Sequence, residues 1–264
     1  MNNFIDFLYT LESQDSELIH TIISGYDTIF ESFTDVSTSV LKAYNRLLNI
    51  SISDVDLTHN GYAIINIPLD DTEVIFQITV GRNMECKAFY PNIVLMKISD
   101  VLFTLMKHDI NAFKQQISRT NIRHAILHEL GHVYEYSKRD KNNTTEQLKR
   151  LNDLYADTEP SDVEYHNHRS EKLANYTSTV LYRILDAVKS NIQDPNEMYK
   201  FVISKLEQDA ANTDHLATSI RSLNNKHKNK LYKRIANIIN ELNNAHESDL
   251  KTITRIVSNE LKDD

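Results

Sequence analysis

Cysteine is almost absent from this sequence. Cys86 is the only one among 264 residues, so the chain can form neither an intrachain disulfide nor a zinc site built from cysteines alone. A chain without disulfides suits a reducing compartment. The N-terminus shows no basic segment followed by a long apolar core, so no secretory signal is visible. We therefore expect a cytoplasmic protein.

Long apolar runs and an excess of positive charge are also missing. No stretch approaches the roughly 18 consecutive apolar residues of a membrane-spanning helix. Lysine and arginine number 29 against 37 aspartate and glutamate residues, which gives a net charge of −8. This balance argues against general affinity for nucleic acids or anionic membranes. We expect neither a nucleic acid nor a membrane among the partners.

Glycine and proline number only four each, which is low for a loop-rich fold. Apolar residues recur instead at helical spacing over most of the chain, and a central part alternates as strands do. The pattern predicts an α+β fold that is predominantly helical. Helices are expected at about 18–30, 38–48, 99–118, 121–138 and from Glu171 onward, with further stripes at 232–242 and 250–261; strands are expected at 62–67, 73–80 and 92–98.

These elements divide into three regions. Residues 1–50 form an N-terminal helical region, residues 51–192 hold the strands and the motifs described below, and residues 193–264 form a C-terminal helical region. No low-complexity linker separates them, so we expect one compact unit. The polar connection at 139–167 is typical of a functional lid or of a disordered segment.

The segment His128-Glu129-Leu130-Gly131-His132 is an H-E-x-x-H motif inside an expected helix. Histidines four residues apart lie on one face of a helix, close enough for both rings to reach one Zn²⁺. Glu129 lies beside that face, where it can act as a general base on a metal-bound water. Gly131 weakens a helix interior, which indicates that another segment, such as a substrate-binding strand, approaches closely here.

A catalytic zinc site usually has three protein ligands and one open position. The metzincin extension of the motif fails, because Glu135 and Lys138 stand where its glycine and third histidine belong. Glu171 is the best candidate, with Asn175 one turn further on as a residue that orients a ligating imidazole. The alternative is that Glu171 is an ordinary first-turn acid that suits the helix dipole.

The pair of motifs, H-E-L-G-H followed about forty residues later by E-x-x-A-N at 171–175, resembles the gluzincin branch of the zincin metallopeptidases. Within that branch the similarity is to the ImmA/IrrE-type peptidases, over about residues 90–190. The resemblance implies His128, His132 and Glu171 as zinc ligands and Glu129 as general base. It also implies a small, mostly antiparallel sheet packed on the active-site helix. The edge strand of that sheet would align the substrate, and residues 92–98 are the candidate edge.

Other polar side chains are candidates for stabilising the oxyanion, a role that needs a donor beside the metal-bound carbonyl. His168 and Tyr176 are predicted as catalytic residues on this ground. His166, Tyr165 and Arg169 are alternatives, and either histidine could instead ligate the metal. The competing interpretation is that all of them are exposed polar residues of a loop.

The sequence therefore predicts a soluble zinc metallopeptidase that acts on a protein or peptide. One rival is a non-catalytic binding or structural protein with a zincin fold, such as a phage or mobile-element component. A closed four-ligand site that includes His166 or His168 would favour it. A second rival is a helical interaction protein in which the H-E-x-x-H motif is accidental, and the lack of a bound metal would identify it.

Overall fold

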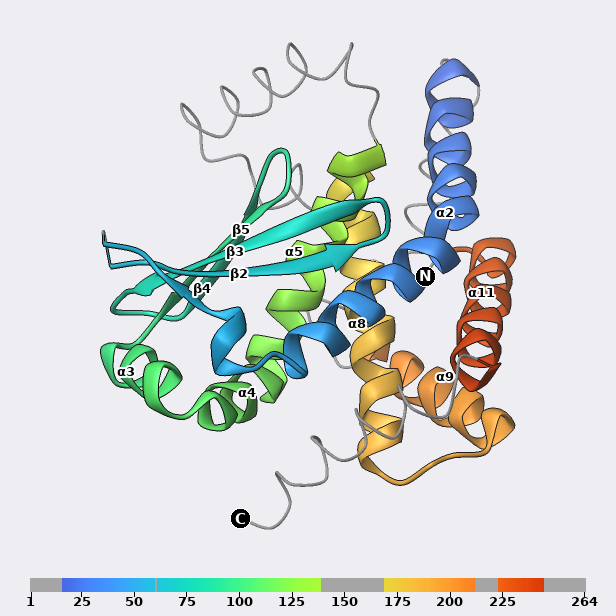
Figure 1. The fold of residues 1–264 in the computed structure, drawn as a ribbon. Coiled ribbons are helices and arrows are strands. Elements are labelled where there is room, and N and C mark those ends of the chain that lie inside the picture. Colours follow the sequence, from blue (N-terminus) through green and yellow to red (C-terminus); the bar gives the residue numbers. More distant parts are fainter. Residues whose placement is uncertain (1–15, 60, 139–168, 212–222, 245–264) are drawn as a thin grey trace.

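The computed structural model describes residues 16–59, 61–138, 169–211 and 223–244 (Figure 1). Over these residues the chain is α+β and mostly helical, as the sequence predicts. Among the described helices, none is both long and apolar enough to cross a membrane. The polar connection at 139–167 and the apolar stripe at 250–261 lie outside the described residues.

A five-stranded sheet forms one side of the molecule (Figure 1). Its strand order is β1-β2-β3-β5-β4, and every neighbouring pair is antiparallel except β3 and β5, which are parallel. The sheet is therefore mostly antiparallel, as expected. The strands are β1 Asp56–Leu57, β2 Ala63–Leu69, β3 Thr72–Val80, β4 Glu85–Phe89 and β5 Ile93–Ile98.

The β2–β3 hairpin follows from alternation and a turn. Every second residue is buried along β2 and in the middle of β3, and Asp70 takes a positive φ of 53° at the turn, a conformation that aspartate tolerates better than most residues. Ile65 pairs with Phe76, which pairs with Val94 of β5, so the apolar side chains form rows across one face. Helices α2 and α5 cover that face.

The expectation about the edge strand was wrong. Residues 93–98 do form a strand, but β5 lies between β3 and β4, and β4 is the edge. The sequence of β4, Glu-Cys-Lys-Ala-Phe, carries two charges and little β-propensity, so its pattern does not predict a strand. Charged, short edge strands of this kind resist edge-to-edge aggregation.

The first helix is longer than expected. Residues 18–30 and 38–48 belong to one helix, α2 (Ser16–Leu48), since no proline interrupts it. Phe33 and Val36 are fully buried and continue the apolar stripe between the two expected helices. A short 3₁₀ turn, η1 (Ile52–Asp54), follows before the sheet begins.

The helix expected at 99–118 is two helices, α3 (Asp100–His108) and α4 (Ile110–Ser118). Asp109 separates them. Its extended backbone ends α3, and its side chain accepts hydrogen bonds from the amides of Asn111 and Ala112 at the start of α4. An aspartate that caps a new helix is a local signal that apolar periodicity cannot detect.

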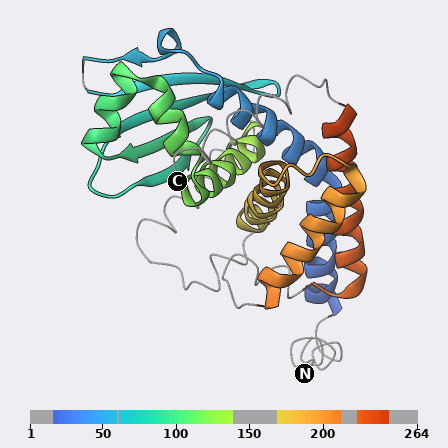
Figure 2. The same cartoon turned by 90° about the horizontal axis from the view of Figure 1, so that it is seen from below.

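The remaining helices build the other side of the molecule. The motif helix α5 (Thr120–Lys138) lies between the sheet and α8 (Arg169–Lys189), while α9 (Pro195–Ala211) and α11 (Asn225–Asn244) pack beyond α8 (Figure 2). The buried apolar residues form one continuous cluster that runs from Phe30 in α2 to Leu242 in α11. All three predicted regions contribute to this core, and α5 and α8 pass through its middle.

Candidate metal centre

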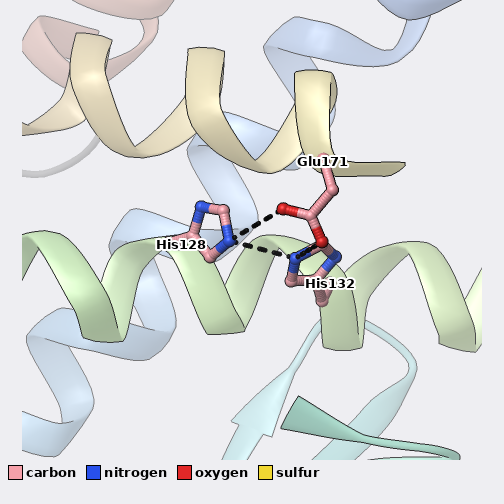
Figure 3. A group of neighbouring side chains, drawn as sticks. All are labelled: His128, His132 and Glu171. Carbon is pink, nitrogen blue, oxygen red and sulfur yellow. Dashed lines mark hydrogen bonds and ion pairs between the residues drawn. The ribbon is translucent and has the colours of Figure 1, made fainter. Parts of the chain in front are cut away.

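Two neighbouring helices bring the three predicted ligands together (Figure 3). His128 and His132 lie one turn apart on α5, and Glu171 lies in the first turn of α8. The helices are antiparallel, because Glu171 meets the end of α5 near His132 while Asp186, at the other end of α8, meets Arg123. The sequence separates Glu171 from the histidines by about forty residues, and the packing of the two helices joins them.

The ligand atoms lie close enough together to hold one metal ion. The Nε2 atoms of His128 and His132 are 3.1 Å apart; Glu171 Oε2 lies 3.3 Å from that of His128, and Glu171 Oε1 lies 3.2 Å from that of His132. Bonds of about 2.0–2.1 Å at a tetrahedral angle place ligand atoms about 3.3 Å apart. The nearest contacts are close to this separation, and one ligand atom from each side chain lies within 4.8 Å of the other two, so the three residues could together hold one small cation.

The three candidate ligands are polar and mostly buried. The side chains of His132 and Glu171 are each 7 % exposed and that of His128 is 15 % exposed. Glu171 Oε2 is buried without a hydrogen-bond partner among the described residues, although the His128 imidazole is within 3.3 Å. Leaving a buried carboxylate oxygen unsatisfied costs free energy, and coordination to a cation would satisfy it.

The electrostatics of the site favour positive charge. Burial alone raises the pKa of Glu171, but the two imidazoles outweigh it, and the net pKa lies well below the usual range of a glutamate. Burial alone lowers the pKa of His132, but Glu171, Glu129 and Glu135 outweigh it, and the net pKa is raised. Surroundings that stabilise a proton on His132 also attract a metal cation.

The glycine in the motif allows the two ligand helices to approach each other. A Cβ built on Gly131 would lie 3.2 Å from the Cα and 3.4 Å from the Cβ of Ala174. The segment that approaches Gly131 is therefore helix α8 and not a substrate-binding strand. Small residues at both positions set the separation that brings Glu171 to the histidines.

Gly131→Val is expected to push α8 away from α5 and to lower the affinity of the site for a divalent cation by more than about tenfold, because ligand atoms displaced by even 1 Å no longer match the metal. Titration with Zn²⁺ as the probe cation against a competing chelator measures this change. The matched control is Gly131→Ala, whose single methyl requires a shift of only a few tenths of an ångström, so its effect should be smaller. Unchanged affinity in Gly131→Val would contradict the assigned role of this contact.

Glu129 lies on the side of α5 that faces the sheet. Its Oε2 atom accepts a hydrogen bond of 2.6 Å from the backbone amide of Ala88 in β4. Because this amide donates to α5 and not to β5, it belongs to the free side of the edge strand. The charge of Glu129 is also close enough to raise the pKa of His132. The carboxylate thus lies between the ligand cluster and the strand edge.

Cys86 also lies close to this carboxylate. It stands two residues before Ala88 on β4, opposite Met96, and is half-buried. Burial raises the pKa of the Cys86 thiol well above its usual value, and the negative charge of Glu129 adds to the shift. The thiol therefore stays protonated at neutral pH and is a poor nucleophile or metal ligand.

The two residues predicted to stabilise the oxyanion have different outcomes. His168 lies outside the described residues, as do His166 and Tyr165. Tyr176 is fully buried, with its ring 5.9 Å from that of Phe30 in α2. It stands five residues after Glu171, about 140° further round α8. The packing places Tyr176 in the apolar core and not with the ligand cluster, and its catalytic role stays a prediction without structural support.

Two further residues next to the site were missed. The Ala88 amide has no sequence signal, because a backbone group is available at every residue. Tyr136 does have one, since it follows His132 by four residues and therefore shares its face of α5. The Tyr136 ring stacks on the His132 ring, with centroids 6.1 Å apart and planes inclined by 19°.

A buried ionic network holds the other end of the α5–α8 pair. Arg123 of α5 is 2 % exposed and donates to Asp186 of α8 at 2.9 Å. Asp186 also accepts from Arg183, which in turn pairs with Asp209 of α9. The ring of Tyr182 lies 4.8 Å from the guanidinium carbons of both arginines. The network therefore joins α5, α8 and α9.

The chain was compared with models of known protein families, with curated proteins and with solved structures. No family model, no curated protein and no solved structure matches it.

Proposed function

We propose that this protein is a zinc-dependent peptidase of the gluzincin type. The observation that carries the proposal is the grouping of His128, His132 and Glu171 where two antiparallel helices meet, with a Glu171 oxygen 3.2–3.3 Å from each imidazole and the imidazoles 3.1 Å apart. Two imidazoles and one carboxylate are a ligand set that catalytic zinc sites use, and they leave one coordination position for water or substrate.

The surroundings of the ligands support hydrolysis and not only metal storage. A bound zinc ion would lower the pKa of a water molecule and polarise a carbonyl group. Glu129 is a carboxylate beside the cluster that is not one of its three ligands, so it remains available to take a proton from the attacking water. The same side chain then delivers the proton to the leaving amine.

The position of β4 supports a peptide as substrate. The Ala88 amide on the free side of the edge strand already donates to Glu129, so an added peptide would pair with the other outward-facing main-chain groups of β4. An extended peptide can add to such an edge through main-chain hydrogen bonds, which leads its own amide groups past the metal. A mostly antiparallel sheet packed on the motif helix, with its edge strand beside the site, is the arrangement expected of a zincin.

Zinc content tests the ligand set. Protein purified without added metal is expected to hold about one zinc per chain, as catalytic sites with three protein ligands do. Glu171→Ala should lower the zinc content and weaken the zinc affinity by at least about tenfold. Loss of a residue that only supports a ligand already costs about that much, and loss of the ligand itself should cost no less. Elemental analysis and chelator competition give both quantities.

Glu197→Ala is the matched control. Glu197 is an exposed acid in the first turn of α9, so its removal has the same effect on a helix dipole without touching the cluster. If Glu171 were only a first-turn acid, the two variants would behave alike. Equal zinc content in both variants, or none in the wild type after reconstitution, would overturn the proposed ligand set.

A further inference from the structure

Aromatic rings lead from the ligand cluster to the end of the edge strand. The Tyr136 ring stacks on His132 and also contacts the ring of Tyr90, which lies edge-on at 6.1 Å with an interplanar angle of 72°. Tyr90 follows directly after β4 and is 40 % exposed. The two tyrosines therefore connect a predicted zinc ligand with the strand expected to hold the substrate.

The position of Tyr90 along the strand places this pair next to the reaction. Ala88, whose amide contacts Glu129, is two residues from Tyr90, a distance of about 6.6 Å along a strand. A peptide that lies along the free edge of β4 with one bond at the metal therefore carries the neighbouring residue past Tyr136 and Tyr90.

We propose that Tyr136 and Tyr90 form a specificity subsite for an aromatic or large aliphatic side chain of the peptide residue adjoining the scissile bond. This inference rests on the proposed function and names the substrate class of the same site. Rings in edge-to-face contact at 4.5–7 Å offer both faces and edges to a third ring. A methyl or short polar side chain is too small to cover these rings, so its contact with them contributes little binding free energy.

The outer face of β4 provides a contrast. Phe89 is 43 % exposed, but it alternates with Ala88 and points to the opposite side of the sheet, where the Lys87 ammonium lies 5.6 Å from its ring. Phe89 and Tyr90 are thus similar in size and exposure and differ in which side of the strand they occupy.

Two small metal-chelating probes test the subsite without needing a cleaved substrate. L-phenylalanine hydroxamate and L-alanine hydroxamate share the zinc-binding group and differ by one phenyl ring. We expect the zinc-loaded wild type to bind the phenylalanine probe about tenfold more tightly, as calorimetry can measure. Tyr136→Leu and Tyr90→Ala should each reduce this ratio to within about threefold, whereas Phe89→Ala should leave the ratio at its wild-type value.

Each outcome separates the subsite from the proposed function. Equal affinity of the two probes for the wild type, or a preference that survives both tyrosine substitutions, overturns the subsite and leaves the zinc site standing. A fall in zinc affinity in Tyr136→Leu with an unchanged ratio would make Tyr136 a positioning residue for His132 and would also overturn the subsite. Failure of the zinc-loaded wild type to bind either hydroxamate overturns the proposed function itself, and the subsite with it.

Discussion

Glu129→Gln is expected to lower kcat by about 10³-fold while the zinc content stays at the wild-type level. General-base catalysis contributes about 10²–10⁴-fold to rates, and a glutamine amide cannot take the proton from the attacking water. The measurement is the cleavage of a peptide library by the zinc-loaded proteins, read by mass spectrometry and then repeated on the best substrate for kcat and KM.

In this structure the Glu129→Gln substitution is expected to change the proton transfer without disturbing the packing. Glutamine has the shape of glutamate, and its amide oxygen can still accept the Ala88 N–H that now binds Glu129 Oε2 at 2.6 Å. The contact between α5 and β4 is therefore retained, and a loss of rate reports on the proton transfer. A change in KM with unchanged kcat would instead indicate a role in binding.

The result also separates the proposal from its rivals. Proteolysis retained in Glu129→Gln would contradict the mechanism, since another group would then be the base. No cleavage by a wild type that holds zinc tightly in four ligands would favour a non-catalytic protein with a structural metal. His132→Ala is the companion variant, because it should lose the metal and the activity together.

Asp186→Ala is expected to lower the free energy of unfolding by about 3–5 kcal/mol, the usual cost of removing one partner of a buried ion pair. Arg123 is 2 % exposed and donates to Asp186, so the substitution leaves a charged guanidinium inside the protein without its carboxylate. Burying such a charge unpaired is expensive because the interior solvates it poorly. Urea unfolding measures the change as a shift in midpoint at constant slope.

Asp209→Ala is the matched control within the same network. Asp209 pairs with Arg183, whose side chain is 19 % exposed and keeps its second partner, Asp186, after the substitution. The remaining contact and partial access to water should limit the loss to about 1 kcal/mol. Losses of equal size in the two variants would contradict the view that burial of Arg123 dominates the energetics of this network.

The sequence determined the elements that depend on local pattern and local chemistry. Helix α5 follows from its apolar stripe, and the positions of His128 and His132 on one face follow from its pitch alone. The β2–β3 hairpin follows from alternation and a turn at Asp70. Glu171 was assigned correctly to the first turn of a helix because that helix has its own apolar rhythm. These features need no information about distant residues.

Other features were not predicted, for two different reasons. The break between α3 and α4 depends on the local cap at Asp109, and the continuity of α2 depends on residues between its two apolar stripes; apolar periodicity alone detects neither. The edge position of β4 depends on which strands pair, and a charged five-residue segment gives no hint of its neighbours.

Only the tertiary structure decided how the site is assembled. Packing of Gly131 on Ala174 sets the distance between α5 and α8, and that distance brings Glu171 within 3.3 Å of both imidazoles. Pairing of β4 with β5 places a backbone amide beside Glu129. The sequence named the reactive groups because chemistry resides in side chains. Their separations arise from contacts between residues far apart in the chain, and those contacts exist only once the helices and the sheet share one core.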